Sequence, residues 1–181
     1  MFKDMNSLIT PTLRTLTWLG RNHRNSFYVR ELAQKLSIST GAASSQLRIL
    51  AESGLVTSEQ KGRTLMYRAD ISQPLVREAK IFRNLAELTP FIADIRENVT
   101  RVILFGSCAT GEDTEESDID LLIETSDKSA LQKIIARHEE EIPRKISPII
   151  VSAEESGQLR IRDRPLYDRI RSGKTLAGEP L

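Results

Sequence analysis

Two short polar segments of this sequence carry side chains that could act on phosphate groups. Gly106 and Ser107 directly follow an apolar run, and after ten intervening residues come Asp118 and Asp120. A glycine lets the backbone approach a phosphate closely, while Ser107 and the helix that we expect to begin there supply hydroxyl and N–H donors. The two aspartates stand at i and i+2 of a predicted strand, so both carboxylates project from one face.

These residue types together point to one kind of chemistry. Two neighbouring carboxylates repel each other unless a cation offsets their charge, and oxygen-only ligands suit Mg²⁺ or Mn²⁺. A phosphate cradle beside such a cation is what transfer of a nucleoside monophosphate (NMP) from a nucleoside triphosphate (NTP) requires. We therefore expect Gly106 and Ser107 to bind nucleotide phosphates, and Asp118 and Asp120 to be both metal ligands and catalytic residues.

The elements that must hold these residues follow from apolar runs. Residues 102–105 predict a buried strand that ends at Gly106, and a second strand begins at Asp118. We further expect a helix over 129–141, a strand over 146–151, short helices near 154–159 and 166–170, and a closing segment at 175–177. Together these elements predict an α/β or α+β domain.

Residues 105–123, with their Gly-Ser pair, ten-residue spacing and Asp-x-Asp motif, resemble the signature of the nucleotidyltransferase superfamily that includes DNA polymerase beta. The resemblance also implies a third carboxylate on a neighbouring strand, where active members hold the catalytic metal. Here that strand, residues 145–151, has no acid, and Ser147 or Pro148 stands at the corresponding position. Glu154 or Glu155 would have to reach back from the following turn. One metal and a nucleotide can still bind, but general-base and two-metal chemistry are compromised, so enzymatic activity stays open.

The first 70 residues predict a different domain. Helices are expected over 5–21, with Pro11 near its start, and over 29–36; a third begins with Thr40 as its N-cap and runs to Ser53. The turn between the second and third helices contains the apolar Ile38, an arrangement that presents the later helix to the major groove of DNA. Polar residues on that helix are expected to reach bases and phosphates; they are Thr40, Ser44, Ser45, Gln46 and Arg48.

A hairpin follows the third helix. Residues 55–58 and 64–68 predict two strands, joined by a turn that carries the cations Lys61 and Arg63. Residues 28–69 resemble the winged helix-turn-helix of ArsR- and MarR-type transcriptional regulators. The resemblance implies a recognition helix in the major groove, contacts of Lys61 and Arg63 with the backbone or minor groove, and binding as a homodimer. The alternative is a winged helix that binds proteins instead of DNA.

Charge and composition agree with a two-domain chain. Residues 1–70 carry 10 Lys or Arg against 5 Asp or Glu, a net charge of +5 that suits double-stranded DNA, whereas residues 71–181 carry a net charge of −4. The single Cys108 excludes a disulfide framework, and it forms no metal-ligand pair with His23 or His138 at helical spacing. No run approaches the roughly 18 apolar residues of a membrane span, so we expect a cytoplasmic protein without membrane contact.

The sequence thus predicts an α+β chain of two domains. These are a winged helix-turn-helix over 1–70 and a nucleotidyltransferase-like mixed sheet with helices over 99–181, joined by a helical connector over 71–98 that breaks at Pro90 and forms a possible dimer seam. Three functions are open. The first is a DNA-binding regulator whose second domain binds a nucleotide with Mg²⁺, and the second is an active transferase of NMP from NTP to a protein, RNA or small molecule, as in toxin-antitoxin systems. The third is an interaction scaffold that uses neither motif.

Overall fold

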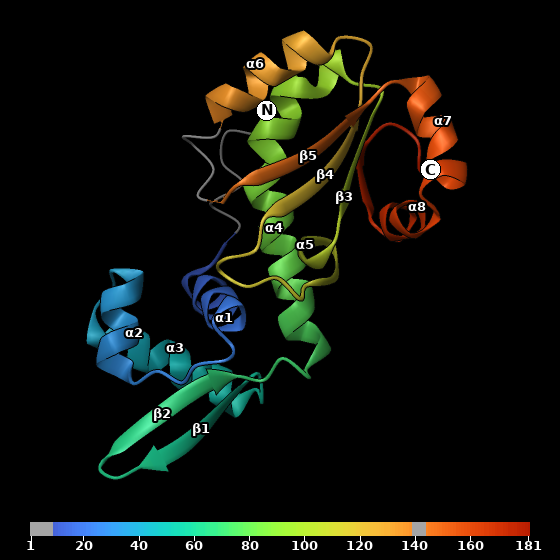
Figure 1. Cartoon of the computed structure of the whole chain (residues 1–181). Coiled ribbons are helices and arrows are strands. Elements are labelled where there is room, and N and C mark those ends of the chain that lie inside the picture. Colours follow the sequence, from blue (N-terminus) through green and yellow to red (C-terminus); the bar gives the residue numbers. More distant parts are fainter. Residues whose placement is uncertain (1–8, 139–143) are drawn as a thin grey trace. The chain divides into compact units, whose positions relative to one another are not determined.

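The computed structural model of the protein describes residues 9–138 and 144–181, which form two compact units (Figure 1). One unit extends to Arg83, and the other begins at Asn84. The first is mostly helical with a hairpin, and the second is a mixed sheet with helices, so the predicted α+β, two-domain fold is confirmed. No helix within these two ranges is long and apolar enough to cross a membrane.

The first unit is a three-helix assembly followed by an antiparallel hairpin. Its elements are α1 (Pro11–Arg21), α2 (Val29–Leu36), α3 (Thr40–Glu52), β1 (Val56–Lys61) and β2 (Thr64–Ala69). Buried leucines from all three helices form its core, with Leu32 and Leu47 fully enclosed. Phe27 packs edge to face against Trp18, with ring centroids 4.8 Å apart, and closes the core near the hairpin.

Local hydrogen bonds explain where these helices begin. Thr10 caps α1 by accepting a hydrogen bond from the Leu13 N–H, and Pro11 occupies the first helical position. Ser39 caps α3 by accepting from the Ala42 N–H, so the expectation that Thr40 is the N-cap is wrong by one residue. Residues 5–8 of the predicted first helix lie outside the described residues.

The connector is one uninterrupted helix, α4 (Pro74–Ile95), followed by the short 3₁₀ helix η2 (Arg96–Asn98). The predicted break at Pro90 is therefore wrong. A proline in a helix interior removes one backbone hydrogen bond, but Leu88, Phe91 and Ile95 on both sides of Pro90 are completely buried. Their packing keeps the helix continuous against the local preference.

The second unit is built on a four-stranded sheet of order β5-β4-β3-β6. Its strands are β3 (Arg101–Phe105), β4 (Ile119–Glu124), β5 (Ile146–Val151) and β6 (Lys174–Ala177); its helices are α5 (Ser107–Thr110), α6 (Lys128–His138), α7 (Ala153–Arg162) and α8 (Arg164–Arg171). Strand β3 is antiparallel to β4 and β6, while β4 and β5 are parallel. The last residues of the predicted helix at 129–141, from 139 on, lie outside the described ranges.

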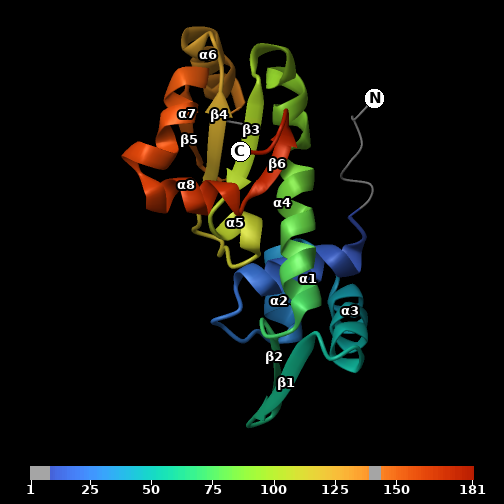
Figure 2. The same ribbon diagram turned by 90° about the vertical axis from the view of Figure 1, so that its right-hand side faces the viewer.

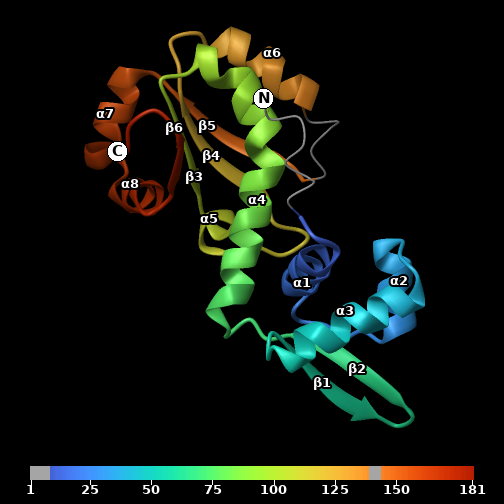
Figure 3. The same cartoon turned by 180° about the vertical axis from the view of Figure 1, so that it is seen from behind.

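Helices cover both faces of this sheet. Buried residues Val102, Leu104 and Leu121 pack on one face with α4 and α6, which lie together on that side in the view from behind (Figure 3). Ile103, Phe105 and Leu122 pack on the other face with α7 and α8, as seen from the side in Figure 2. Because side chains alternate along a strand, the aspartate at position 120 belongs to this second face.

Candidate functional site

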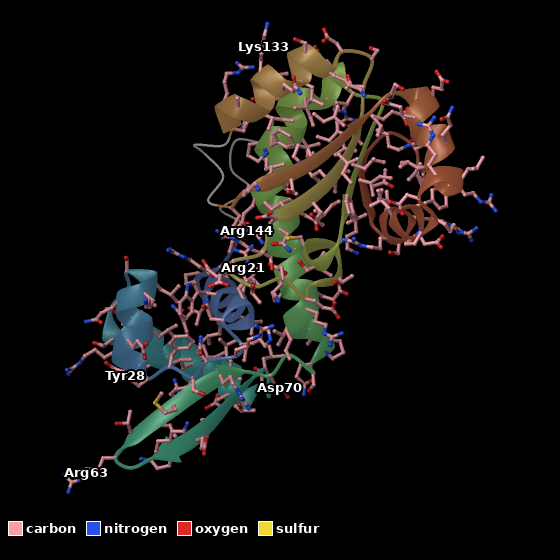
Figure 4. All side chains as sticks on the ribbon, viewed as in Figure 1. Arg21, Tyr28, Arg63, Asp70, Lys133 and Arg144 are labelled. Atoms are coloured by element: carbon pink, nitrogen blue, oxygen red, sulfur yellow. The ribbon has the colours of Figure 1, made fainter. Side chains whose placement is uncertain are left out.

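The start of α3 and the tip of the hairpin are open to solvent. Four of the five α3 residues predicted to contact DNA are exposed: Thr40, Ser44, Ser45 and Arg48. Lys61 and Arg63 are exposed at the hairpin turn, and Figure 4 labels Arg63 at its outermost point. Gly62 makes this tight turn possible with a positive φ of 61°.

Gln46 is the exception, and its predicted outward position is wrong. Its side chain is buried, and its amide oxygen accepts a hydrogen bond from the Thr15 hydroxyl of α1. Position 46 lies three residues after Ala43 and four before Leu50, both of which are core residues of α3. Helical spacing therefore places Gln46 on the inner face, where it joins two helices and is not available to a base.

A groove of about 450 Å³ lies between the helices of this unit and the β1–β2 hairpin, which we call the wing. Tyr28 and Arg30 from the start of α2 line it, together with Thr40 of α3 and Arg63 of the turn. Tyr28 is 40% exposed despite its size. Tyr28 and Arg30 were not predicted as site residues, although an exposed cation in the first turn of α2 is a side chain that could contact a phosphate.

In the second unit, three residues form a row across the sheet. Asp120 on β4 is the register partner of Phe105 on antiparallel β3 and of Ser147 on parallel β5. Register partners project from the same face, so these three side chains are neighbours. The row lies at the end of β3 that leads into Gly106 and Ser107, which brings the predicted phosphate-binding pair next to Asp120.

Gly106 and Asp120 are in direct contact. Gly106 has a φ of 69° and precedes α5 as its N-cap, and a Cβ placed on it would overlap the Oδ2 atom of Asp120. Both observations require glycine at this position. The Asp120 carboxylate therefore lies against the backbone of the Gly106-Ser107 bend.

β4 begins at Ile119, one residue later than predicted, so Asp118 directly precedes the strand, and its side chain is 45% exposed. Its Oδ2 atom lies 3.9 Å from Nζ of Lys145 and accepts a long, 3.4 Å hydrogen bond from the Ser147 hydroxyl. Lys145 and Ser147 both stand at the start of β5, which runs parallel to β4. The lysine was not predicted as a site residue, although parallel strands that start together could have indicated it.

The electrostatics of Asp120 reflect this crowding. Burial raises the pKa of Asp120 above its ordinary value, the positive charge of Arg169 lowers it, and the negative charge of Asp118 raises it further. The upward shift means that burial makes the ionised form of Asp120 less favourable than it is for an aspartate in water. The influence of Asp118 also shows that the two carboxylates feel each other's charge.

Arg169 of α8 is the second cation of this site. It lines a pocket of about 380 Å³ together with Asp120, Lys145 and Ser147. Its guanidinium carbon lies 5.6 Å from the centre of the Phe105 ring, the distance of a cation–π contact. The local sequence does not indicate that Arg169 lies at this pocket, because 48 residues separate it from Asp120 and only the fold brings the two together.

No carboxylate stands beside the aspartate pair on β5. Ser147 takes the position next to Asp120, whereas Pro148 pairs with Leu121 and belongs to the opposite face. Glu155 lies beyond the far end of β5, where it accepts hydrogen bonds from Lys128 and from the backbone N–H of Ser152. At roughly 3.3 Å per residue, the strand separates it from Ser147 by well over 10 Å.

These residues fit one divalent cation but not two. Asp118 and Asp120 offer carboxylate oxygens to a single Mg²⁺ or Mn²⁺, which completes its shell with water or phosphate. Within residues 9–138 and 144–181, no group of three His, Cys, Asp or Glu side chains could hold a metal. That finding includes His23, which contacts the Gly20 carbonyl, and His138, whose Nε2 lies 2.9 Å from Asp94.

A buried polar network centred on Arg144 lies close to the candidate site. Arg144 donates hydrogen bonds to Asp113 at 3.1 Å, to Asn84 at 2.7 Å and to Glu87 at 3.0 Å. Asp113 is fully buried, although it lies in the acidic segment 112–116. Cys108 is buried and donates a hydrogen bond to the Asp118 carbonyl. Figure 4 labels Arg144, which lies just before β5.

Two family models match segments of the chain, one in each unit. Residues 23–58 match the family model described as "Bacterial regulatory protein, arsR family". Residues 85–171 match the model of the nucleotidyltransferase domain. No curated protein matches the chain. The two matched ranges contain α2 and α3 on one side and the Gly-Ser bend, both aspartates and Arg169 on the other.

Proposed function

We propose that this chain, which joins an ArsR-family helix-turn-helix domain to a nucleotidyltransferase domain, is a DNA-binding transcriptional regulator that senses a nucleotide. The observation that carries the proposal is Ser147 at the position beside Asp120. It leaves a phosphate-binding bend and two carboxylates without the third acid on which transfer depends. Such a site retains the parts needed to bind a nucleotide.

The first unit supplies DNA binding. Exposed Ser44, Ser45 and Arg48 of α3 would enter the major groove, where their hydrogen-bonding groups reach base edges. Arg63 on the wing and Arg30 in the groove beside α2 would hold the phosphate backbone. We propose that residues 1–70 form the DNA-binding domain and that residues 71–98 connect it to the second domain, as the sequence predicts.

DNA binding is tested by fluorescence anisotropy with a duplex selected from a random library, at several salt concentrations. Arg63→Ala should weaken binding and reduce the slope of log affinity against log salt by about 1, because one phosphate contact is lost. Arg48→Ala should weaken binding as well. Lys133→Ala on α6 removes the same charge in the other domain and should leave binding unchanged. Equal effects of Lys133→Ala and Arg63→Ala would contradict this role of the wing.

In the second unit, Gly106 and Ser107 would bind the phosphates of an NTP, while Asp118 and Asp120 would hold one Mg²⁺ or Mn²⁺. When bound, the cation supplies positive charge that stabilises the triphosphate. Isothermal titration calorimetry with ATP and GTP in Mg²⁺ tests this proposal. Asp120→Asn should weaken nucleotide binding in Mg²⁺, whereas Asp127→Asn, an exposed acid beyond the far end of β4, should not.

An active transferase is the alternative, and the retained pair Asp118 and Asp120 beside Gly106 is the observation that favours it. Incubation with labelled ATP, GTP, CTP or UTP and Mg²⁺ would then label a protein, RNA or small-molecule acceptor. The labelling would disappear in Asp118→Ala. We expect no such labelling, since Ser147 cannot act as a general base in place of a carboxylate.

We also propose that the chain acts as a homodimer. Leu75 and Phe82 of α4 are 65% and 38% exposed and stand seven residues apart, on one side of the helix. Burying them against a second copy would remove apolar surface from water. Multi-angle light scattering should give twice the chain mass, and the double variant Leu75→Lys, Phe82→Lys should give the monomer mass.

A further inference from the structure

We propose that Arg169 and Lys145 replace part of the metal charge in the nucleotide site, so that this chain binds the triphosphate of a nucleotide without a divalent cation. The inference rests on the proposed function, because it assumes that a nucleotide occupies the pocket beside Asp120. It adds the class of recognition: a phosphate chain held by the protein's own guanidinium and ammonium groups.

Arg169 is positioned for such a contact. The next residue, Ile170, is completely buried in the core under α8, and Leu166 packs there too, so the helix holds Arg169 at the pocket wall. The Phe105 ring supports the face of the guanidinium at 5.6 Å. Within the described part of the chain, the guanidinium N–H groups form no hydrogen bond and no ion pair within 4 Å. They are therefore available to phosphate oxygens, which a guanidinium binds in a two-pronged way.

Lys145 adds a second, more adaptable cation. Its side chain is 73% exposed, and its Nζ lies 3.9 Å from the Asp118 carboxylate, a distance that allows attraction without a fixed hydrogen bond. The long, flexible side chain of lysine can turn from this carboxylate to a phosphate at little cost. Both cations thus lie beside the acids that a metal would otherwise neutralise.

The charges of the pocket balance without a metal. Asp118 and Asp120 contribute two negative charges, and Lys145 and Arg169 contribute two positive charges, whereas Ser147 contributes none. A third carboxylate at position 147 would leave an excess negative charge, which repels phosphate unless a metal is present. The replacement of this acid by serine and the presence of two cations therefore have the same electrostatic effect. Both make the pocket accept an anion.

Calorimetric titration of the full-length protein with ATP, in EDTA and again in Mg²⁺, tests the inference. The wild type should bind ATP in EDTA with an affinity within about tenfold of that in Mg²⁺. Arg169→Ala should lose about tenfold or more in EDTA, the expected effect of one charged hydrogen bond. Arg169→Lys should recover part of this loss, because it restores the charge but not the fork of donors. Inorganic tripolyphosphate should compete with ATP, since the phosphates carry the recognition.

Arg171→Ala is the matched control, because Arg171 lies on the same helix, is exposed and forms no ion pair with another described residue. It should change the affinity less than twofold. Wild-type binding that requires Mg²⁺, or equal losses in Arg169→Ala and Arg171→Ala, would overturn this inference and leave nucleotide binding itself intact. Absence of binding in both EDTA and Mg²⁺ would overturn the nucleotide-binding proposal along with it. Urea unfolding of each variant checks that a weaker affinity does not arise from loss of the fold.

Discussion

Gly106 is the residue at which backbone conformation and site chemistry meet. Its φ of 69° favours glycine, and the Asp120 carboxylate fills the space that a side chain would need. Gly106→Ala should therefore destabilise the protein by about 1–3 kcal/mol through backbone strain, and displace Asp120 as well. Urea unfolding measures the loss of stability.

Gly157→Ala is the control for this substitution. Gly157 lies inside α7, and nothing lies within 4 Å of a Cβ placed on it. The change should raise stability by roughly 0.5–1 kcal/mol, since alanine favours a helix interior more than glycine does. Equal effects at the two glycines would show that the contact with Asp120 has no energetic consequence.

The sequence could predict part of the residue-level site. Gly106, Ser107, Asp118 and Asp120 form a local motif, and their spacing was visible without a structure. Arg169 was not predictable, because its relation to Asp120 depends on the packing of α8 against the sheet. Gln46 was misassigned by emphasis on its polarity, although its spacing from Ala43 indicated the core.

Among the elements, α4 stays continuous although it contains Pro90, because its buried side chains hold the helix in place. Pro90 is exposed and lies in the last third of the helix, where it cannot donate a hydrogen bond to the carbonyl four residues earlier. Pro90→Ala should restore that bond and raise the free energy of unfolding by roughly 1–3 kcal/mol. Thermal and urea unfolding check the gain.

Pro74→Ala tests the same exchange at the first position of α4. A proline there removes an N–H that has no partner within the helix, so this variant should change stability much less than Pro90→Ala. A loss of stability in Pro90→Ala would mean that the rigid ring itself supports the helix. A break was predicted at Pro90 because helix propensity is a local property, whereas the burial of Phe91 and Ile95 depends on the tertiary fold.

The start of α7 makes a pH-dependent contribution to stability. Hydrogen bonds from Lys128 and from the Ser152 backbone lower the pKa of Glu155 from 4.5 to about 2. A lowered pKa in the folded state means that the ionised form stabilises the fold. This contribution is fully present above pH 4.5 and is lost as the pH falls from 4.5 to about 2.

Glu155→Gln should therefore be less stable than the wild type at neutral pH, and the difference should shrink through that acid range. Urea midpoints at a series of pH values follow it. Glu154→Gln, at the neighbouring exposed position in the first turn of α7, should change the midpoints little. A constant difference between Glu155→Gln and the wild type down to pH 2 would contradict the role of the charge.

On the scale of the whole molecule, the two units have separate cores. Leu47 lies in the core of the helix-turn-helix unit and Leu121 in that of the sheet unit, and both are completely buried. Each Leu→Ala change should cost roughly 2–5 kcal/mol in its own unit. Hydrogen exchange should then show faster exchange around β3 and β4 for Leu121→Ala, with α2 and α3 unchanged, and the reverse for Leu47→Ala.

The bounds of single elements could be predicted from the sequence, whereas the way the strands are assembled into a sheet could not. The hydrophobic spacing of α2 and the apolar run of β5 gave the bounds of both elements, since each pattern is local. The order of strands in the sheet, and the antiparallel pairing of β6 with β3, had no comparable signal.

The hydrogen-exchange prediction for the two leucine variants has a clear opposite outcome. If Leu47→Ala or Leu121→Ala made exchange faster across both units, the two cores would act as one cooperative unit.

The row of Phe105, Asp120 and Ser147 also bears on the ancestry of such proteins. An aspartate at position 147 would stand on the correct face without any change of backbone, because the register of β4 and β5 is already in place. A change of this single codon would therefore place a third acid beside the aspartate pair. The obstacle to such a change is charge and not geometry. An aspartate at position 147 would lie beside the carboxylates of Asp118 and Asp120, and the two cations of the pocket, Lys145 and Arg169, balance only those two negative charges.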